Sequence, residues 1–302
     1  MDSGSTMAAD SNSSVLAPGM APAEGKRPWA LKSLPPFPAV ALQLLSVLDD
    51  EDVPMKKIVD LLRIDPALSA EILRVANSAL YGLSRRVDNI SHAIVILGTE
   101  SVKRLALTVA LGRFSHSFLR NQSLRVCWDH SVACALIAQE IALASGAAKD
   151  RAYTGGLLHD VGRLALLACY PVEYGNLIVV ARDNGFDELD CERQLFDIDH
   201  CAAGEWLGRL WNLPGDIVEA IARHHSAEVM GNSLLSIVTA ANAVADAIGF
   251  NVLDMPPPRT VAEITAGLPF HDRDEAVAKL AGFAETVRAT VSSVTPVSSV
   301  RR

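Results

Sequence analysis

Aromatic residues are scarce in this sequence, at 5% of 302 residues, and it has no alternating runs of valine, isoleucine and threonine. Both features are typical of β-strands, so their scarcity argues against a sheet. Positive charge is also in short supply, because the formal net charge is −8. That balance excludes a sequence-wide basic surface for nucleic acid. We therefore expect an all-α protein with no nucleic-acid partner.

Cysteine is sparse too: the chain has five, an odd number, and no Cys-x-x-Cys pair. This usage favours reduced thiols over a disulfide framework or a zinc ribbon. The N-terminus has no basic segment that leads into an apolar run, so we expect no signal peptide. We also find no run that approaches the ~18 apolar residues of a membrane span. These absences predict a cytoplasmic protein with no membrane association.

What the sequence does have is helical periodicity. The patterns divide the chain into a disordered tail over 1–30, one domain over 31–250, C-terminal helices over 251–295 and a flexible tail over 296–302. Within the domain, short helices predict a compact N-terminal subdomain over 34–115, and longer helices follow over 116–250. Asp65 is expected to cap a helix whose first turn contains Pro66. Two terminal helices are expected after the prolines at 256–258.

Five of the eight histidines lie beside apolar stripes of the long helices: His130, His159, His200, His224 and His225. A single histidine on an apolar face is more often a packed core residue than a ligand. Each buried imidazole nitrogen without a partner costs free energy, however, so five are hard to explain one at a time. A shared metal ion would satisfy them together.

The dipeptide His159-Asp160 is central to this hypothesis. It lies in GGLLHDVGRL, which predicts a position in the middle of a helix, with glycines that allow close backbone approach. Imidazole and carboxylate together suit iron, manganese, zinc, cobalt or nickel. Asp246 is a further candidate, but it lies on a mixed helix face, and a solvated surface position is equally open.

Seven segments follow one another along the chain: LPPFPAVALQLLSVL, DPALSAEILRVANSALYG, ISHAIVILGTESVKRLAL, WDHS, GGLLHDVGRLAL, HCAAGEWLGRLWNLP and AIARHH. In order and spacing they resemble the HDOD domain family over residues 30–250. The resemblance implies a multi-helix fold of the HD superfamily with a helical N-terminal subdomain. It also implies a bacterial signalling protein that acts through contacts with a protein partner.

The resemblance extends to the related HD-GYP phosphodiesterases, which bind two or more metal ions. Their order of ligands implies one ion held by His130, His159, Asp160 and Asp246. A second ion would be held by Asp160, His200, His224 and His225, with Asp160 shared. The expected cofactor is a pair of divalent transition metal ions, iron or manganese first, with zinc, cobalt or nickel as alternatives.

The chain departs from the HD-GYP pattern in two places. Arg163 stands where that pattern has lysine, which keeps the charge but offers a planar fork to a phosphate. Ser226 follows the paired histidines, where the pattern has glutamate, and Gly-Tyr-Pro is missing. We therefore expect little hydrolysis of cyclic di-GMP.

Three functions stay open. The first is a regulatory protein that retains the metal and binds a signalling partner. The second is a metal-dependent phosphohydrolase that acts on a nucleotide or another phosphodiester, with Arg163 contacting phosphate. The third is a scaffold in which the histidines are merely packed.

Overall fold

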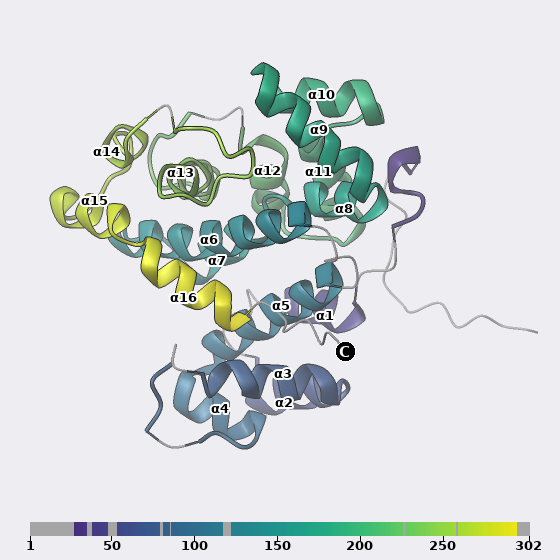
Figure 1. The fold of residues 1–302 in the computed structure, drawn as a ribbon. Coiled ribbons are helices and arrows are strands. Elements are labelled where there is room, and N and C mark those ends of the chain that lie inside the picture. The colour runs from purple at the N-terminus through teal and green to yellow at the C-terminus, as the bar shows by residue number, and fades with distance from the viewer. Residues whose placement is uncertain are drawn as a thin grey trace, which may run out of the picture.

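Every regular element in the described part of the chain is a helix (Figure 1). The computed structural model describes residues 27–34, 38–47, 53–78, 81–84, 86–116, 122–225, 228–257 and 259–294. The predicted all-α fold is therefore confirmed. The predicted tail over 296–302 lies outside the described residues, as does the tail at the N-terminus up to residue 26.

The end of the predicted N-terminal tail is structured, which corrects its boundary. Trp29–Leu31 forms a 3₁₀-helix, η1, in which Ala30 and Leu31 are fully buried. Trp29 donates from Nε1 to Asp197 at 3.0 Å, and its ring meets the edge of Tyr170. These contacts are with residues far along the chain, so the local composition could not indicate them.

Five helices form the N-terminal group, at the bottom of Figure 1. They are α1 (Ala39–Leu45), α2 (Met55–Arg63), α3 (Pro66–Ala76), α4 (Ile90–Leu97) and α5 (Thr99–His116). The predicted cap of α3 is confirmed, because Asp65 accepts from the Leu68 N–H at 2.9 Å and Pro66 is the first helical residue. Helices α1, α3 and α4 pack on α5, which also contacts α6 and α7. Helix α5 thus connects this group to the rest of the protein.

The second group surrounds the long helix α6. Its members are α6 (Gln122–Ala144), α7 (Lys149–Leu158), α8 (Val161–Cys169), α9 (Pro171–Asn184), α10 (Glu188–Phe196), α11 (His200–Leu210), α12 (Gly215–Arg223) and α13 (Leu234–Ala247). Helices α7 and α13 pack on α6, and α8 packs on α11. Helix α6 is long and apolar enough to cross a membrane, which corrects the expectation that no run approaches that length, but 67% of its most apolar window is buried among these neighbours. That burial is typical of a central core helix.

Three helices, not the two predicted, follow the proline-rich segment: α14 (Val261–Ile264), α15 (Arg273–Ala281) and α16 (Ala284–Val294). The extra one, α14, is a single turn closed by a capping box between Thr260 and Glu263. Helices α15 and α16 both pack on α6, and α16 also reaches α5 (Figure 1). Arg74 on α3 donates to the Ser293 carbonyl at 3.1 Å. The C-terminal helices therefore contact both groups.

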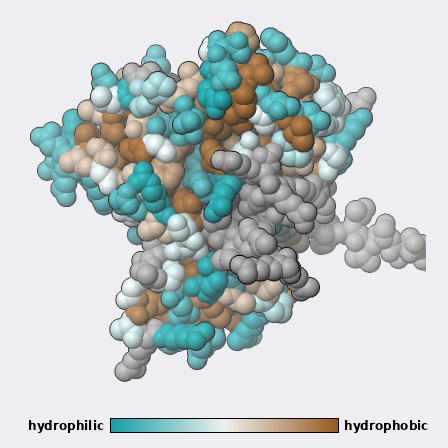
Figure 2. Space-filling model, in the orientation of Figure 1, coloured by the Kyte–Doolittle hydropathy of each residue, from teal (hydrophilic) through white to brown (hydrophobic). Residues whose placement is uncertain are grey.

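Apolar side chains are not all buried. Helices α9 and α10 with their connection expose Val172, Val179, Val180, Phe186 and Leu195. Figure 2 shows apolar surface in the region of these two helices, among hydrophilic residues. Other side chains of the same two helices, Tyr174, Leu177 and Phe196, are buried in a core shared with η1, α8 and α11.

Two glycines let the helices approach closely around the His159-Asp160 dipeptide. A Cβ on Gly156 of α7 would lie 2.6 Å from the Cys134 carbonyl oxygen of α6. A Cβ on Gly162 of α8 would lie 2.0 Å from the His200 carbonyl oxygen. No side chain fits at either distance, so the predicted role of these glycines in close backbone approach is confirmed.

The dipeptide itself is not in the middle of a helix, which corrects the prediction. Helix α7 ends at Leu158, α8 begins at Val161, and Asp160 between them has φ −100° and ψ 19°. The two helices pack mainly on different partners, α7 on α6 and α8 on α11, although α8 also contacts α6. This break places His159 and Asp160 at a junction of helix ends.

Because Gly156 has no room for a side chain, Gly156→Ala should lower the free energy of unfolding by about 1–3 kcal/mol through overpacking of α7 on α6. Gly215→Ala is the matched control, since a Cβ there has no atom within 4 Å. Thermal melts of both variants test the packing. Equal melting temperatures for the two would contradict it.

Candidate metal centre

Four side chains converge where helix ends meet. His159 and Asp160 lie between α7 and α8, His200 is the first residue of α11, and His224 follows the end of α12. Each of the four is at most 1% exposed. The Nε2 atoms of His200 and His224 lie 3.4 and 3.3 Å from Asp160 Oδ1. Asp160 is thus the common neighbour of imidazoles from separate helices.

Each of the three imidazoles is oriented by a hydrogen bond from its outer nitrogen. His159 Nδ1 donates to the Gly156 carbonyl at 2.7 Å, and His224 Nδ1 donates to the Ile221 carbonyl at 2.9 Å. His200 Nδ1 donates to the Glu192 carboxylate at 2.8 Å. Such bonds fix the tautomer that leaves the Nε2 lone pair facing inward, as in metal-binding histidines.

The inward atoms are the ones that lack partners. Among the described residues, His159 Nε2, His224 Nε2 and Asp160 Oδ1 are buried and have no hydrogen bond. Leaving a buried polar atom unsatisfied costs about 1–3 kcal/mol. A cation between these atoms would remove that cost at all three. The donor set of neutral nitrogens and a carboxylate oxygen fits a divalent transition metal.

Burial and charge set the ionisation of the cluster. Burial lowers the pKa of His159 well below its usual value and also lowers the pKa of His224, so both are neutral with free lone pairs. Burial opposes ionisation of Asp160, but Arg163 and the histidines outweigh it and hold the pKa of that carboxyl well below its usual range. The centre therefore presents an ionised carboxylate on Asp160 and neutral imidazoles on His159 and His224, the forms that bind metals.

His200 differs from the other two imidazoles. Burial and Arg163 oppose its protonation, yet Glu192 and Asp160 outweigh them and raise the pKa of His200 well above its usual value. Glu192 is fully buried and also accepts from the His200 backbone N–H at 2.6 Å. Without a metal this imidazole binds a proton, which a metal ion would displace.

Arg163 is buried and engaged by two carboxylates. Its Nε donates to Asp160 Oδ2 at 2.7 Å, and its two outer nitrogens pair with the Glu188 carboxylate. The bond from Arg163 uses one oxygen of Asp160 and leaves Oδ1 facing the histidines. Arg163 therefore orients the central carboxylate; its contact with a phosphate stays a prediction.

The other three predicted ligands lie at the edge of this core. His130 is buried, with its ring 5.3 Å from that of His159, and it contacts the Phe250 carbonyl at 2.6 Å and Asn242 Oδ1 at 2.9 Å. Asp246 Oδ1 lies 3.7 Å from His130 Nδ1, and its side chain is 35% exposed. Asp246 is thus half-buried beside a predicted ligand, not on a fully solvated face.

His225 is the exposed member of the cluster. Its ring lies 4.5 Å from that of His224 and 4.9 Å from that of His200. It lines a pocket of about 220 Å³ with His224, Asn242, Asp246 and Arg259. This pocket connects the buried histidines with the surface.

Four residues of the centre were missed in the sequence: Cys134, Glu188, Glu192 and Cys201. Cys134 could have been found, because it lies four residues after His130 on the same helix face, and its Sγ is 3.5 Å from His130 Nε2. Cys201 directly follows a predicted ligand. Glu188 and Glu192 lie on α10, a helix that contains no predicted ligand. The neighbouring residues in the sequence did not distinguish these two glutamates from solvent-exposed ones.

Comparison with known proteins agrees with this architecture. The sequence profile of the HDOD domain matches residues 34–227. A protein from Shewanella amazonensis SB2B described as a candidate phosphohydrolase is 27% identical, with a TM-score of 0.70 over 89% of this chain and 100% of that one. An HDOD domain protein of unknown function from Geobacter sulfurreducens is 25% identical, with a TM-score of 0.72 over 87% of this chain and 94% of that one.

A curated relative is longer than this chain. The sequence is 27% identical over 198 residues to an uncharacterised protein of Treponema pallidum (strain Nichols). That match covers 65% of this chain and 38% of the relative, so the chain spans well under half the relative's length.

The hydrogen bonds from His200 to the Glu192 carboxylate give a test of the centre. Glu192→Gln removes the charge that holds Nδ1, and the loss of such an outer partner should weaken metal affinity by about 10–100-fold. Glu205→Gln on the exposed side of α11 is the matched control and should leave affinity unchanged. Titration against a competing chelator measures both. Equal affinities would show that the Glu192 contact does not support a ligand.

Proposed function

Because the chain belongs to the HDOD domain family, we propose that it is a regulatory protein that holds divalent transition metal at the Asp160 centre and acts by binding a signalling partner. The observation that carries this proposal is the set of buried, inward atoms without partners on His159, Asp160 and His224. A scaffold of packed histidines has no reason to leave them unsatisfied.

The formal charge of the centre supports a cation. Three carboxylates, those of Asp160, Glu188 and Glu192, are buried together with a single guanidinium, that of Arg163. Buried charge without compensation is costly, and the protonation of His200 offsets only part of the excess. A divalent metal ion would neutralise the remaining negative charge.

The positions of the ligands support a regulatory role. The ligands come from the α7–α8 junction, the start of α11 and the end of α12. An ion bound by all of them would join the ends of separate helices. Binding at this junction would favour one arrangement of the helices over others. The partner would then bind the surface that this arrangement of helices presents.

The second candidate function is a metal-dependent phosphohydrolase. The pocket beside His224 and His225 favours it, because Arg259 on its rim would attract an anionic phosphodiester towards the ligands. The likeness to the candidate phosphohydrolase from Shewanella amazonensis points the same way. Metal bound there would polarise a water or a phosphate oxygen. Turnover of a panel of phosphodiesters would select this function over the regulatory one.

Cyclic di-GMP is not expected to be a substrate. Gly-Tyr-Pro is missing from the sequence, and Ser226 stands where the related phosphodiesterases have an acidic residue. Incubation of the metal-loaded protein with cyclic di-GMP should give no linear product by chromatography. A linear product that is lost in His159→Ala would contradict this expectation.

The metal itself is tested by its stoichiometry. We expect the purified protein to contain transition metal, and Asp160→Ala to lose more of it than His200→Ala, because a carboxylate can bridge two ions and an imidazole cannot. Bound metal should also raise the melting temperature, since the unfolded chain has no preformed site. Elemental analysis and thermal melts of the three proteins provide the measurements.

The outcomes separate the hypotheses. A parent protein that binds no transition metal after anaerobic purification without chelators favours the packed-histidine scaffold. Equal losses in the two variants would leave a metal site but remove the bridging role of Asp160.

A further inference from the structure

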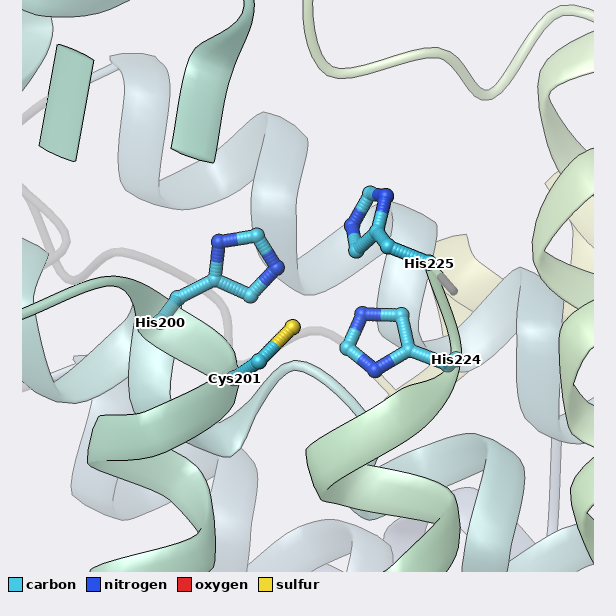
Figure 3. A group of neighbouring side chains, drawn as sticks. All are labelled: His200, Cys201, His224 and His225. Atoms are coloured by element: carbon cyan, nitrogen blue, oxygen red, sulfur yellow. The ribbon is translucent and has the colours of Figure 1, made fainter. Parts of the chain in front are cut away.

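A thiol points into the histidine cluster. Cys201 follows His200 in the first turn of α11, and it is 7% exposed. Figure 3 shows its sulfur directed into the space between the rings of His200 and His224, with His225 beside them. One donor atom from each of these four residues lies within 4.8 Å of the other three. This sulfur belongs to neither of the two ligand sets predicted from the sequence.

Local structure fixes the two pairs of donors. Asp199 caps α11 by accepting from the Ala202 N–H at 2.8 Å, which sets the start of the helix just before His200 and Cys201. His224 and His225 are consecutive at the end of α12. Gly204 lets α11 approach α12, because a Cβ there would lie 2.5 Å from Ile221 Cγ2. The close approach brings a His-Cys pair opposite a His-His pair.

We propose that Cys201 supplies a thiolate ligand to the ion held by His200, His224 and His225, which makes this part of the centre a mixed nitrogen and sulfur site for zinc. The inference rests on the proposed function, since it requires a metal at the centre. Zinc binds histidine nitrogen at about 2.0–2.1 Å and cysteine sulfur at about 2.3 Å. Tetrahedral donors at these lengths lie about 3.3–3.8 Å apart. The present four lie within 4.8 Å of one another, so the donors would have to move closer by up to about 1 Å on binding.

The thiolate changes which metal the centre prefers. Sulfur is a soft ligand that selects zinc over manganese, whereas nitrogen and oxygen alone would admit iron or manganese. Three imidazoles and a thiolate already complete the four-coordinate shell of a structural zinc site. Asp160 Oδ1, 3.4 Å from His200 Nε2 and 3.3 Å from His224 Nε2, would be a further protein donor beside these four. A shell filled by protein atoms would leave no position for a water, so this ion would hold the helix ends together and would not hydrolyse a substrate.

The chain offers a matched control in Cys134. It is also buried and also lies beside a predicted ligand, with Sγ 3.5 Å from His130 Nε2. It belongs to a separate group with His130 and His159. Substituting each cysteine in turn therefore distinguishes a thiolate on one side of the centre from a thiolate on the other.

Cobalt(II) is the probe, because a thiolate bound to cobalt gives a charge-transfer absorption that nitrogen and oxygen ligands do not. The full chain loaded with cobalt should show this absorption in the near ultraviolet. Cys201→Ser should lose it to baseline, whereas Cys134→Ser should keep it. Cys201→Asp supplies an oxygen donor in place of sulfur and should bind cobalt without the absorption. Circular dichroism checks that each variant is folded.

Two results overturn the inference and leave the metal centre standing: bound cobalt without charge transfer in the parent, or charge transfer that survives in Cys201→Ser. A folded Cys201→Ser that loses cobalt, with binding restored in Cys201→Asp, supports Cys201 as a ligand. A parent protein that binds neither cobalt nor zinc removes the proposed function itself. The failure of the inference and the failure of the proposed function therefore give different spectra.

Discussion

The fold of the second helix group depends on one buried carboxylate. Asp160 is 1% exposed, and its charge is stabilised on one side by Arg163 and faces His200 and His224 on the other. An uncompensated charge at that depth would cost several kcal/mol, so its neighbours cannot be exchanged independently. Arg163 is buried because Asp160 and Glu188 hold it, and Glu192 is buried because His200 does. The centre is a network in which each charged member requires another.

This network explains why the helix ends meet at one point. A continuous helix through His159-Asp160 would direct adjacent side chains about 100° apart. At the break between α7 and α8, Asp160 lies beside His200 and His224, and the ring of His159 lies 4.9 Å from that of His224. Gly156 and Gly162 permit the close contacts on either side of the break. Residues 156–162 therefore have to combine glycines that allow close helix packing with the two polar side chains of the centre.

Much of this architecture was predictable from local patterns, and the rest depended on distant contacts. Helical periodicity gave the all-α fold, and the sequence Asp65-Pro66 gave the start of α3, because caps involve only neighbouring residues. The order of the histidines indicated the residues that gather around Asp160. The break after Leu158, the burial of Ala30 and Leu31, and the clamp by Glu192 all arise from contacts between segments far apart in the chain. Composition cannot reveal such contacts.

The central claim is that the inward atoms of this cluster bind metal and not water or one another. The most direct measurement is anomalous X-ray diffraction at the zinc absorption edge, from crystals of the full chain grown with zinc. The account predicts a strong anomalous peak among His159 Nε2, Asp160 Oδ1 and His224 Nε2, the three buried atoms that have no hydrogen bond. A map with no anomalous peak there, and with ordered water or direct hydrogen bonds on those three atoms, would contradict it.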